Sequence, residues 1–201
     1  MNLFALIVLA YLIGSVPFAL VIGKSFYDTD VREHGSRNLG ASNSGRVLGK
    51  AAGAAVMVLD AAKVFLVVIL ASCLCEDAAA VPLGGLAAGI GHCYPVFAKF
   101  KGGKAVAGLY GFLFGLFTFV GYSPLVFFLP LAVFLAVLYT TKIIALSSMI
   151  SSAVAAVYVY LAGDSIPMFG VLTVYALLII FRHRENIKRI LKGEENKISW
   201  M

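Results

Sequence analysis

The sequence predicts an all-α integral membrane protein: a compact bundle of seven transmembrane helices, with the N-terminus outside and the C-terminus in the cytoplasm. Of its 201 residues, 61% are hydrophobic and 13% are charged, and the mean hydropathy is +0.96. A soluble domain of this size has too little interior to hide so many apolar side chains. In addition, long apolar runs recur along the chain, and the basic residues gather in alternate connections between them.

The apolar runs set the number of spans. A helix that crosses a bilayer needs about 20 mainly apolar residues, within a range of about 17 to 25. We expect spans at 3–22, 51–73, 83–98, 105–121, 124–140, 143–162 and 167–181. The third and fifth are short, and prolines lie in or near several of them, so five or six spans are the alternative. The first run has neither a basic segment before it nor a small-residue cleavage site, which indicates a retained helix.

The basic residues indicate the orientation of the spans. With seven spans, one face receives five Lys or Arg from 23–50, three from 99–104, Lys142, and six after residue 181. These are fifteen of the sixteen in the chain, and Lys63 is the other one. The opposite connections carry Glu76, Asp77 and Asp164 and no Lys or Arg. Because cytoplasmic loops are enriched in Lys and Arg, the basic face is predicted to be cytoplasmic. Two explanations of such a basic face stay open and fit equally well: topology with attraction to anionic headgroups, and a binding role.

The first basic connection, residues 23–50, is rich in Gly, Ser and Asn. Such residues favour tight turns that present backbone N–H groups, and a structureless loop of this length is unusual in a compact domain. Donors of the kind that phosphate oxygens accept come from Ser36, Arg37, Asn38, Ser42, Asn43 and Arg46. The connection therefore indicates an anion site, and a flexible solvated linker is the alternative.

The second connection lies within residues 91–108 and reads HCYPVFAKFKGGKAVAG from His92. Pro95 disfavours continuation of the preceding helix, and Gly102, Gly103 and Lys104 lead into the next one. A helix start preceded by glycines offers free N–H groups to an anion, and Lys104 adds a full charge. The nucleotide-binding pattern GxxxxGK[ST] is absent. His92 is either a packed helix residue or a functional one, since ionisable groups in spans are often functional.

The third connection covers residues 182–197. Ile187, Ile190 and Leu191 recur at helical spacing, which predicts an amphipathic helix along the inner membrane surface. His183 and Asn186 are three residues apart and share a face of that helix. A basic helix of this kind is either a membrane anchor or part of a site that all three polar connections build together.

Several classes of protein are excluded or disfavoured. Cys73, Cys75 and Cys93 give neither a disulfide framework nor metal-ligand spacing, so we expect them to be packing residues. We predict no metal and no cofactor. We also predict no nucleic-acid partner, because no basic segment carries interleaved aromatic residues. No obligate protein partner is evident. Without a repeat or a low-complexity tract, residues 1–201 are expected to form one membrane domain.

Four stretches of the chain carry a resemblance. They are Gly14, Ser15 and Pro17, then GSRNLGASN at 35–43, GHCYPVFAKFKGGKAVA at 91–107 and HRENIKRILKGEE at 183–195. In order and placement they resemble the signature segments of the bacterial glycerol-3-phosphate acyltransferases that use acyl phosphate as donor. Two positions depart from the family pattern: Arg37 stands where GSGN has its second glycine, and Ala105 stands where GGKG has its last.

This resemblance implies an enzyme of the bacterial inner membrane whose active site faces the cytoplasm. It would transfer a fatty acyl group from acyl phosphate to the 1-hydroxyl of glycerol 3-phosphate, giving lysophosphatidic acid and phosphate, the first step of phospholipid synthesis. Its partners would be those two substrates and membrane lipids. The resemblance assigns catalysis to Ser36, Arg46, His92 and Lys104. It assigns substrate binding to Gly35, Asn38, Asn43, Gly102, Gly103, His183 and Asn186.

The residues leave some alternatives open. The HxxxxD pattern of another acyltransferase class is absent, and the resemblance implies that a phosphate oxygen of the donor accepts the hydroxyl proton. Asp60 and Lys63 lie one turn apart in the second span, where a structural pair that braces the site is favoured over direct catalysis. A transporter or channel for phosphorylated anions is the competing function, although such proteins commonly contain inverted repeats. A lipid phosphatase is a weaker third hypothesis.

Overall fold

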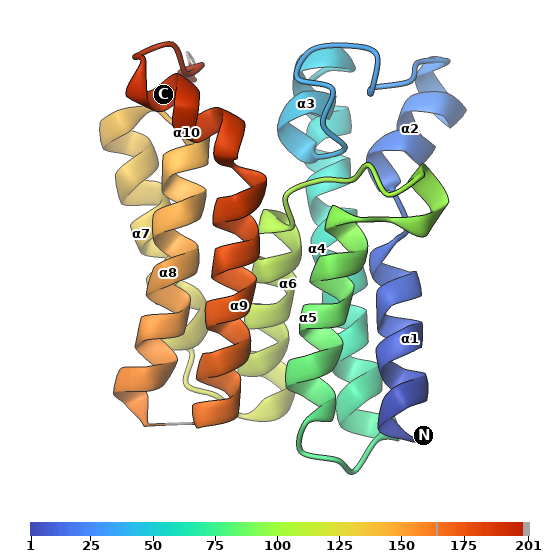
Figure 1. The fold of residues 1–201 in the computed structure, drawn as a ribbon, viewed down its shortest axis with the longest axis vertical. Helices are drawn as coiled ribbons and strands as arrows, with labels where there is room; N and C mark the ends of the chain where they lie inside the picture. The colour runs from blue at the N-terminus through green and yellow to red at the C-terminus, as the bar shows by residue number, and fades with distance from the viewer. Residues whose placement is uncertain (164, 199–201) are drawn as a thin grey trace. The chain divides into compact units, whose positions relative to one another are not determined.

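A computed structural model describes residues 1–163 and 165–198, and every regular element in these ranges is helical. The all-α prediction is therefore confirmed. The chain divides into two compact units, the first spanning Met1–Gly115 and the second beginning at Leu116 (Figure 1). The first unit contains α1 (Leu3–Gly14), α2 (Phe18–Tyr27), α3 (Ala41–Val47), α4 (Lys50–Leu74), α5 (Ala80–Cys93), a 3-10 turn (Val96–Ala98) and α6 (Val106–Gly115). The second contains a π-helical turn (Leu116–Val120), α7 (Leu125–Thr141), α8 (Ile144–Ala162), α9 (Ile166–Arg182) and α10 (Arg184–Leu191).

Helix α4 is the centre of the first unit and contacts α1, α2, α3, α5 and α6. Small residues allow these helices to approach closely, which is the usual basis of helix packing in lipid. A Cβ added to Gly111 of α6 would lie 2.0 Å from the Ala61 carbonyl oxygen of α4. One added to Gly14 of α1 would lie 2.1 Å from the Ala88 carbonyl oxygen of α5. The first unit is therefore closely packed around α4.

In the second unit, α8 contacts both α7 and α9. Its buried face is lined by serines, and each hydroxyl donates to a carbonyl of the same helix. The residues are Ser147, Ser148, Ser151 and Ser152. Because these hydroxyls are satisfied within the helix, they add little cost to burial in an apolar bundle.

Each predicted span is helical over most of its length, with breaks at 15–17 in the first span and at 94–95 in the third. Within the described residues, four helical segments are long and apolar enough to cross a membrane: Leu3–Tyr27, Lys50–Leu74, Ala80–Ala98 and Ile144–Ala162. The α9–α10 pair, bent by 59°, counts as a fifth if it is one broken span. Two further apolar segments, Val106–Val120 and Leu125–Thr141, are shorter. Several crossings are thus supported by length and composition, and seven remains a prediction.

The first predicted span, 3–22, contains a break that the hydropathy pattern did not reveal. Helix α1 ends at Gly14 and α2 begins at Phe18. Pro17, which has no N–H to donate, precedes α2. The carbonyl of Val16 in this break accepts a hydrogen bond of 2.8 Å from Lys63 Nζ of α4. The break therefore gives a buried lysine a backbone partner.

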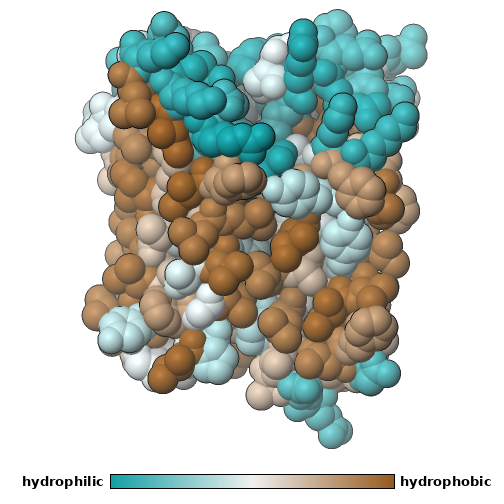
Figure 2. Space-filling view, viewed as in Figure 1, coloured by the Kyte–Doolittle hydropathy of each residue, from teal (hydrophilic) through white to brown (hydrophobic). Residues whose placement is uncertain are grey.

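Within each unit, apolar residues cover the middle of the helices and hydrophilic residues gather mainly at one end, with a smaller hydrophilic group at the opposite end of the first unit (Figure 2). In the first unit the N-terminal amine donates to the Leu74 carbonyl, so the N-terminus lies beside the connection that carries Glu76 and Asp77. The 28–40 loop and the α5–α6 connection lie at the other end of that unit (Figure 1). In the second unit the Ile198 N–H donates to the Lys142 carbonyl, which joins two basic segments. Asp164, in a connection predicted to be acidic, lies outside the described residues.

Candidate active site

The 28–40 loop is held in shape by the side chain of Asn43, which is 2% exposed on α3. Its Oδ1 accepts the Ser36 N–H at 2.8 Å, and its Nδ2 donates to the carbonyls of Val31 at 2.9 Å and His34 at 3.3 Å. Both ends of the amide are therefore committed to the backbone of the loop. These contacts shape the loop around Ser36, and substrate binding by Asn43 stays a prediction.

Gly35 fits closely against the same amide. Its φ is +57°, and a Cβ there would lie 2.4 Å from Asn43 Oδ1. The loop thus turns tightly over Asn43 and leaves the Ser36 side chain exposed. Arg46, in the last turn of α3, is also exposed, and Asn38 is half-buried. Of the candidate donors of the first connection, Ser36, Arg37, Ser42 and Arg46 are exposed, and of these Ser36 and Arg46 are the two that were predicted to be catalytic.

An ion pair fixes the start of this loop. Arg32 Nε donates to Asp30 Oδ1 at 2.9 Å, and Lys24 Nζ lies 3.5 Å from Asp30 Oδ2. Hydrogen bonding by Arg32 holds the pKa of the Asp30 carboxyl well below its usual range, against a smaller opposing effect of burial. Because that pKa is lowered on folding, the pair contributes to stability above about pH 4, and the contribution is lost as the pH falls through the lowered pKa.

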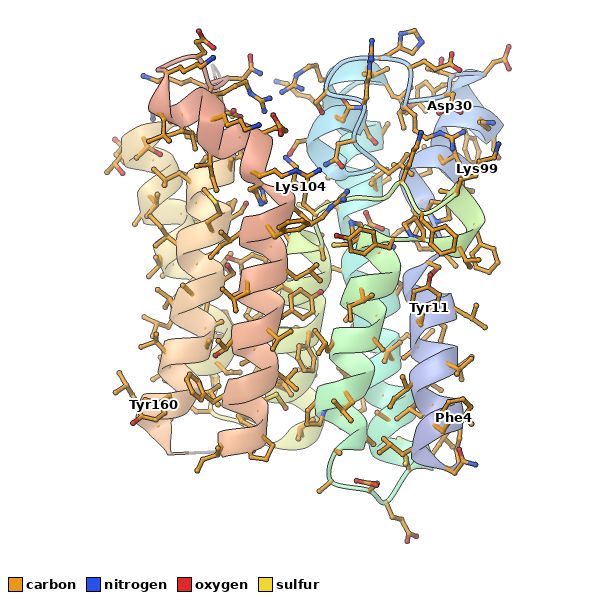
Figure 3. The ribbon with its side chains drawn as sticks, in the orientation of Figure 1. Phe4, Tyr11, Asp30, Lys99, Lys104 and Tyr160 are labelled. Carbon is orange, nitrogen blue, oxygen red and sulfur yellow. The ribbon has the colours of Figure 1, made fainter. Side chains whose placement is uncertain are left out.

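The α5–α6 connection folds back onto the end of α5. The Gly103 N–H donates to the His92 carbonyl at 3.0 Å. A Cβ on Gly102 would lie 2.1 Å from that same carbonyl oxygen, and one on Gly103 would lie 2.0 Å from His92 Nε2. Lys104 comes next and is half-buried, whereas Lys99 is exposed, and the two lie at opposite ends of the connection (Figure 3). The double glycine is therefore required by close packing against His92.

The two connections meet at this turn. A Cβ on Gly103 would lie 2.5 Å from the Leu39 carbonyl oxygen of the first loop. A small cavity beside it is lined by residues of three helices, of the break between α1 and α2, and of both connections: Gly14, Val16, Pro17, Leu39, Asp60, Lys63, His92, Pro95 and Gly102. The structure thus brings His92, Gly102 and Gly103 together with the loop that follows Asn38, as the predicted site requires.

The third segment belongs to the second unit. His183 ends α9, is 3% exposed, and its Nδ1 lies 2.8 Å from the Ile179 carbonyl oxygen. Asn186, on α10, donates through Nδ2 to Glu195 Oε1 at 2.7 Å, and Arg189 Nε donates to Glu195 Oε2 at 2.7 Å. The predicted amphipathic helix is present as α10. Glu195, which the sequence did not single out, folds the following segment back onto it.

We expect Glu195→Ala to lower the free energy of unfolding by about 1–3 kcal/mol, since it removes the acceptor of both the Asn186 amide and the Arg189 guanidinium. The thermal midpoint of the purified protein in detergent measures this loss. Glu194→Ala is the matched control, because that neighbouring carboxylate is exposed. Equal midpoints for the two variants would contradict a holding role for Glu195.

Within residues 1–163 and 165–198, no group of three His, Cys, Asp or Glu side chains is arranged to hold a metal ion. The cationic and hydrogen-bonding groups of the candidate site instead suit phosphate oxygens.

Comparison with known proteins identifies the family. Residues 4–193 match the family described as "Glycerol-3-phosphate acyltransferase". The chain belongs to this family. The glycerol-3-phosphate acyltransferase of Geobacillus kaustophilus is 46% identical over 199 residues, covering 97% of this chain and 95% of that protein. The Bacillus subtilis glycerol-3-phosphate acyltransferase is 44% identical over 196 residues, covering 98% and 97%.

Solved structures agree with this assignment. The chain is similar to PlsY, described as an integral membrane glycerol 3-phosphate acyltransferase, in its glycerol 3-phosphate form, with a TM-score of 0.91 and 36% identity over 99% of this chain and 96% of that one. For the lysophosphatidic acid form of PlsY the TM-score is 0.88 and the identity 35%, with the same coverage. The chain is accordingly a multi-pass membrane protein and an acyltransferase, as its sequence motifs predicted.

The two departures from the family pattern share a backbone feature. Arg37 has φ of +58° and Ala105 has φ of +58°, and both therefore occupy the left-handed region that glycine adopts without strain. This geometry explains why the family pattern has a glycine at both positions. Here Arg37 keeps its side chain exposed, and Ala105 is buried directly before α6. The turns are thus retained with non-glycine residues.

Sequence reasoning missed the backbone carbonyls of Val16 and Leu39, because main-chain groups leave no residue-type signal. It also did not connect Asp60 to His92, which lie 32 positions apart in the sequence and 3.5 Å apart between Oδ1 and Nδ1. Indirect signals were available for Val16, since Pro17 marks a break within an apolar run, and for Asp60 and His92, since an ionisable residue in a span needs a partner.

Proposed function

We propose that this acyltransferase moves a fatty acyl group from an acyl phosphate to the 1-hydroxyl of glycerol 3-phosphate. The observation that carries the proposal is the Gly102–Gly103–Lys104 turn, packed against both His92 and the loop that holds Ser36. The related PlsY has a glycerol 3-phosphate form and a lysophosphatidic acid form, which are the acceptor and the product of this reaction.

The protein has little covalent chemistry to perform in this reaction. An acyl phosphate is a mixed anhydride, so the acceptor oxygen bonds to the acyl carbon while the bond from that carbon to the phosphate oxygen breaks. The hydroxyl proton passes to a phosphate oxygen of the donor, and the products are lysophosphatidic acid and inorganic phosphate. Positioning two phosphorylated substrates and stabilising the shifting negative charge account for the rate.

We assign the charge-stabilising role to Arg46 and Lys104, and hydrogen bonding to Ser36, Asn38 and His92. Gly102 and Gly103 let a phosphate approach the backbone near the start of α6. Gly35 and Asn43 act by shaping the loop around Ser36, as their contacts indicate. In the second unit, His183 and Asn186 are assigned to substrate binding on the strength of the matching segment at 183–195.

The assay that tests this function uses the purified protein with acyl phosphate and glycerol 3-phosphate. Lysophosphatidic acid and phosphate should appear in equal amounts. Acyl-CoA in place of acyl phosphate is the control for the donor, and product from acyl-CoA alone would contradict the donor assignment. Movement of glycerol 3-phosphate across vesicles with no acylated product would instead favour the anion-transporter alternative.

We further propose that the chain is one membrane domain over residues 1–201 with seven spans in the bacterial inner membrane, and that the active site faces the cytoplasm. Seven apolar helical segments support the count, if Val106–Val120 and Leu125–Thr141 are short spans. The charge distribution supports the orientation, because the basic connections would all face one side.

Cysteine labelling in intact cells tests this topology. In a background where the native cysteines are replaced, we expect a cysteine added after Met201, or one within 99–104, to react only from the cytoplasm. Native Cys73 was predicted to be a packing residue, but it is exposed near the end of α4 away from Lys50. Kept alone, it should react from outside. Labelling of either cytoplasmic position by an impermeant reagent applied outside would refute the seven-span arrangement.

We also expect acyl transfer to need no metal ion, because the proposed cationic side chains supply the electrostatic stabilisation. The rate of lysophosphatidic acid formation should be unchanged after exhaustive dialysis against chelator. Recovery of a lost rate on adding Mg²⁺ would count against the proposed role of the side chains.

A further inference from the structure

Three ionisable side chains are buried together in the first unit. Asp60 and Lys63 lie on α4 and His92 lies at the end of α5, with exposed fractions of 2%, 5% and 7%. Lys63 Nζ donates to Asp60 Oδ1 at 2.7 Å, and His92 Nδ1 lies 3.5 Å from the same oxygen. Ionisable groups within a membrane helix are costly, so their presence indicates a role.

The carboxylate of Asp60 acts on the orientation of the imidazole. A carboxylate oxygen facing Nδ1 favours a proton on that nitrogen and fixes the ring orientation. The other ring nitrogen, Nε2, packs closely against Gly103: a Cβ added to that glycine would lie 2.0 Å from it. The backbone of His92 also holds the turn, because its carbonyl accepts the Gly103 N–H at 3.0 Å. A rotation of the ring would therefore move the glycine turn.

Lys63 binds the same carboxylate oxygen of Asp60 that faces His92. Besides Asp60, its ammonium donates to the Val16 carbonyl at 2.8 Å, in the break between α1 and α2. The cavity lined by Asp60, Lys63 and His92 has a volume of about 10 Å³, which is room for about one water molecule. Ligand pockets are typically of the order of hundreds of Å³. The cavity between the three groups is thus too small to enclose a substrate, and Asp60 and Lys63 are arranged to hold each other and His92.

We propose that Asp60 is a positioning residue for acyl transfer: held by Lys63, it orients His92, and His92 sets the Gly102–Gly103 turn from which Lys104 projects. This inference rests on the proposed function for the chemistry that Lys104 performs. It differs from charge compensation, in which Asp60 would serve only to neutralise Lys63. The two explanations predict different activities for a protein that lacks both charges.

The decisive variant is the double change Asp60→Asn with Lys63→Met. Replacing both members of a buried pair is often neutral for stability, whereas removing one leaves a buried charge without compensation. We expect a thermal midpoint close to that of the parent and a kcat/KM for glycerol 3-phosphate at least about tenfold lower, the scale of a modest misplacement of a reacting group. Parental kcat/KM in the double variant would overturn the proposal. Ser151→Ala, which removes a buried hydroxyl from α8, is the control for handling and folding.

A thermodynamic cycle with Lys104 gives a second, independent measurement. If Asp60 acts through Lys104, Asp60→Asn should lower kcat/KM at least about tenfold when Lys104 is present and less than about threefold in a Lys104→Ala background. Equal factors in the two backgrounds would overturn the proposal, since a general loss of structure is additive. If Asp60→Asn does not fold, Asp60→Glu takes its place in the same cycle, because it keeps the charge opposite Lys63 and displaces the carboxylate from His92.

The activity of the parent protein distinguishes failure of this inference from failure of the proposed function. Formation of lysophosphatidic acid by the parent supports the function whatever the variants do. A parent that forms none would defeat the function itself. An active parent with a fully active double variant would defeat only the positioning role of Asp60.

Discussion

Lys104→Ala is expected to lower the turnover of acyl transfer by at least about a hundredfold, the size of effect seen when one preorganised charge donor is removed from an active site. Lys104 is half-buried and follows two glycines that pack against His92, so its charge is held near the start of α6. In the proposed reaction its ammonium neutralises phosphate both when substrate binds and as the acyl–oxygen bond breaks. The rate with saturating acyl phosphate and glycerol 3-phosphate measures the effect.

Lys99→Ala is the matched control, because it removes the same charge from the exposed part of the same connection. It should cost little activity, and each single change leaves two lysines to mark the cytoplasmic side. Lys104→Arg should also be impaired, since a wide planar guanidinium replaces a compact ammonium beside a tight turn. Similar turnover for Lys104→Ala and Lys99→Ala in folded protein would leave the basic connection as a topology signal only.

The helical fold could be predicted because lipid allows few alternatives. Apolar runs of sufficient length must satisfy their backbone within helices, and each of the seven predicted segments is helical over most of its length. The break between Gly14 and Phe18 was harder to predict, since the residues around Pro17 are as apolar as a continuous helix would be. Hydropathy averages over such interruptions, and the interruption matters here because it exposes the Val16 carbonyl to Lys63.

The candidate site was predictable in its residue types and less so in its contacts. Glycines, lysine and histidine in one short polar segment indicated an anion site at 91–108, and the structure joins Gly102 and Gly103 to His92. Asn43, in contrast, is a good phosphate donor by residue type, but its amide is committed to the loop backbone. Whether a polar side chain faces a ligand or its own loop depends on tertiary geometry, which spacing along the sequence does not contain.

Gly103 is packed against both His92 and the first loop, and Gly103→Ala is expected to lower kcat/KM for glycerol 3-phosphate about a hundredfold. The added methyl would lie 2.0 Å from His92 Nε2 and 2.5 Å from the Leu39 carbonyl oxygen, so the turn or its neighbours must move. A displacement of about 1 Å at a reacting group is enough for a loss of this size. Steady-state kinetics with both substrates varied would measure it.

Two comparisons make the Gly103 result specific. Gly170→Ala in α9 meets nothing within 4 Å, and because alanine favours a helix interior, that variant should keep its activity with an unchanged or higher thermal midpoint. Truncating the neighbour, in the double variant Gly103→Ala with His92→Ala, should not restore activity, for two reasons: the imidazole assigned to hydrogen bonding is lost, and the backbone carbonyl of Leu39 cannot be removed by a side-chain change. Its thermal midpoint, compared with that of Gly103→Ala, reports whether the clash with the ring is relieved. Parental kinetics for Gly103→Ala alone would show that the turn has room for a side chain, and would remove the reason for a double glycine before Lys104.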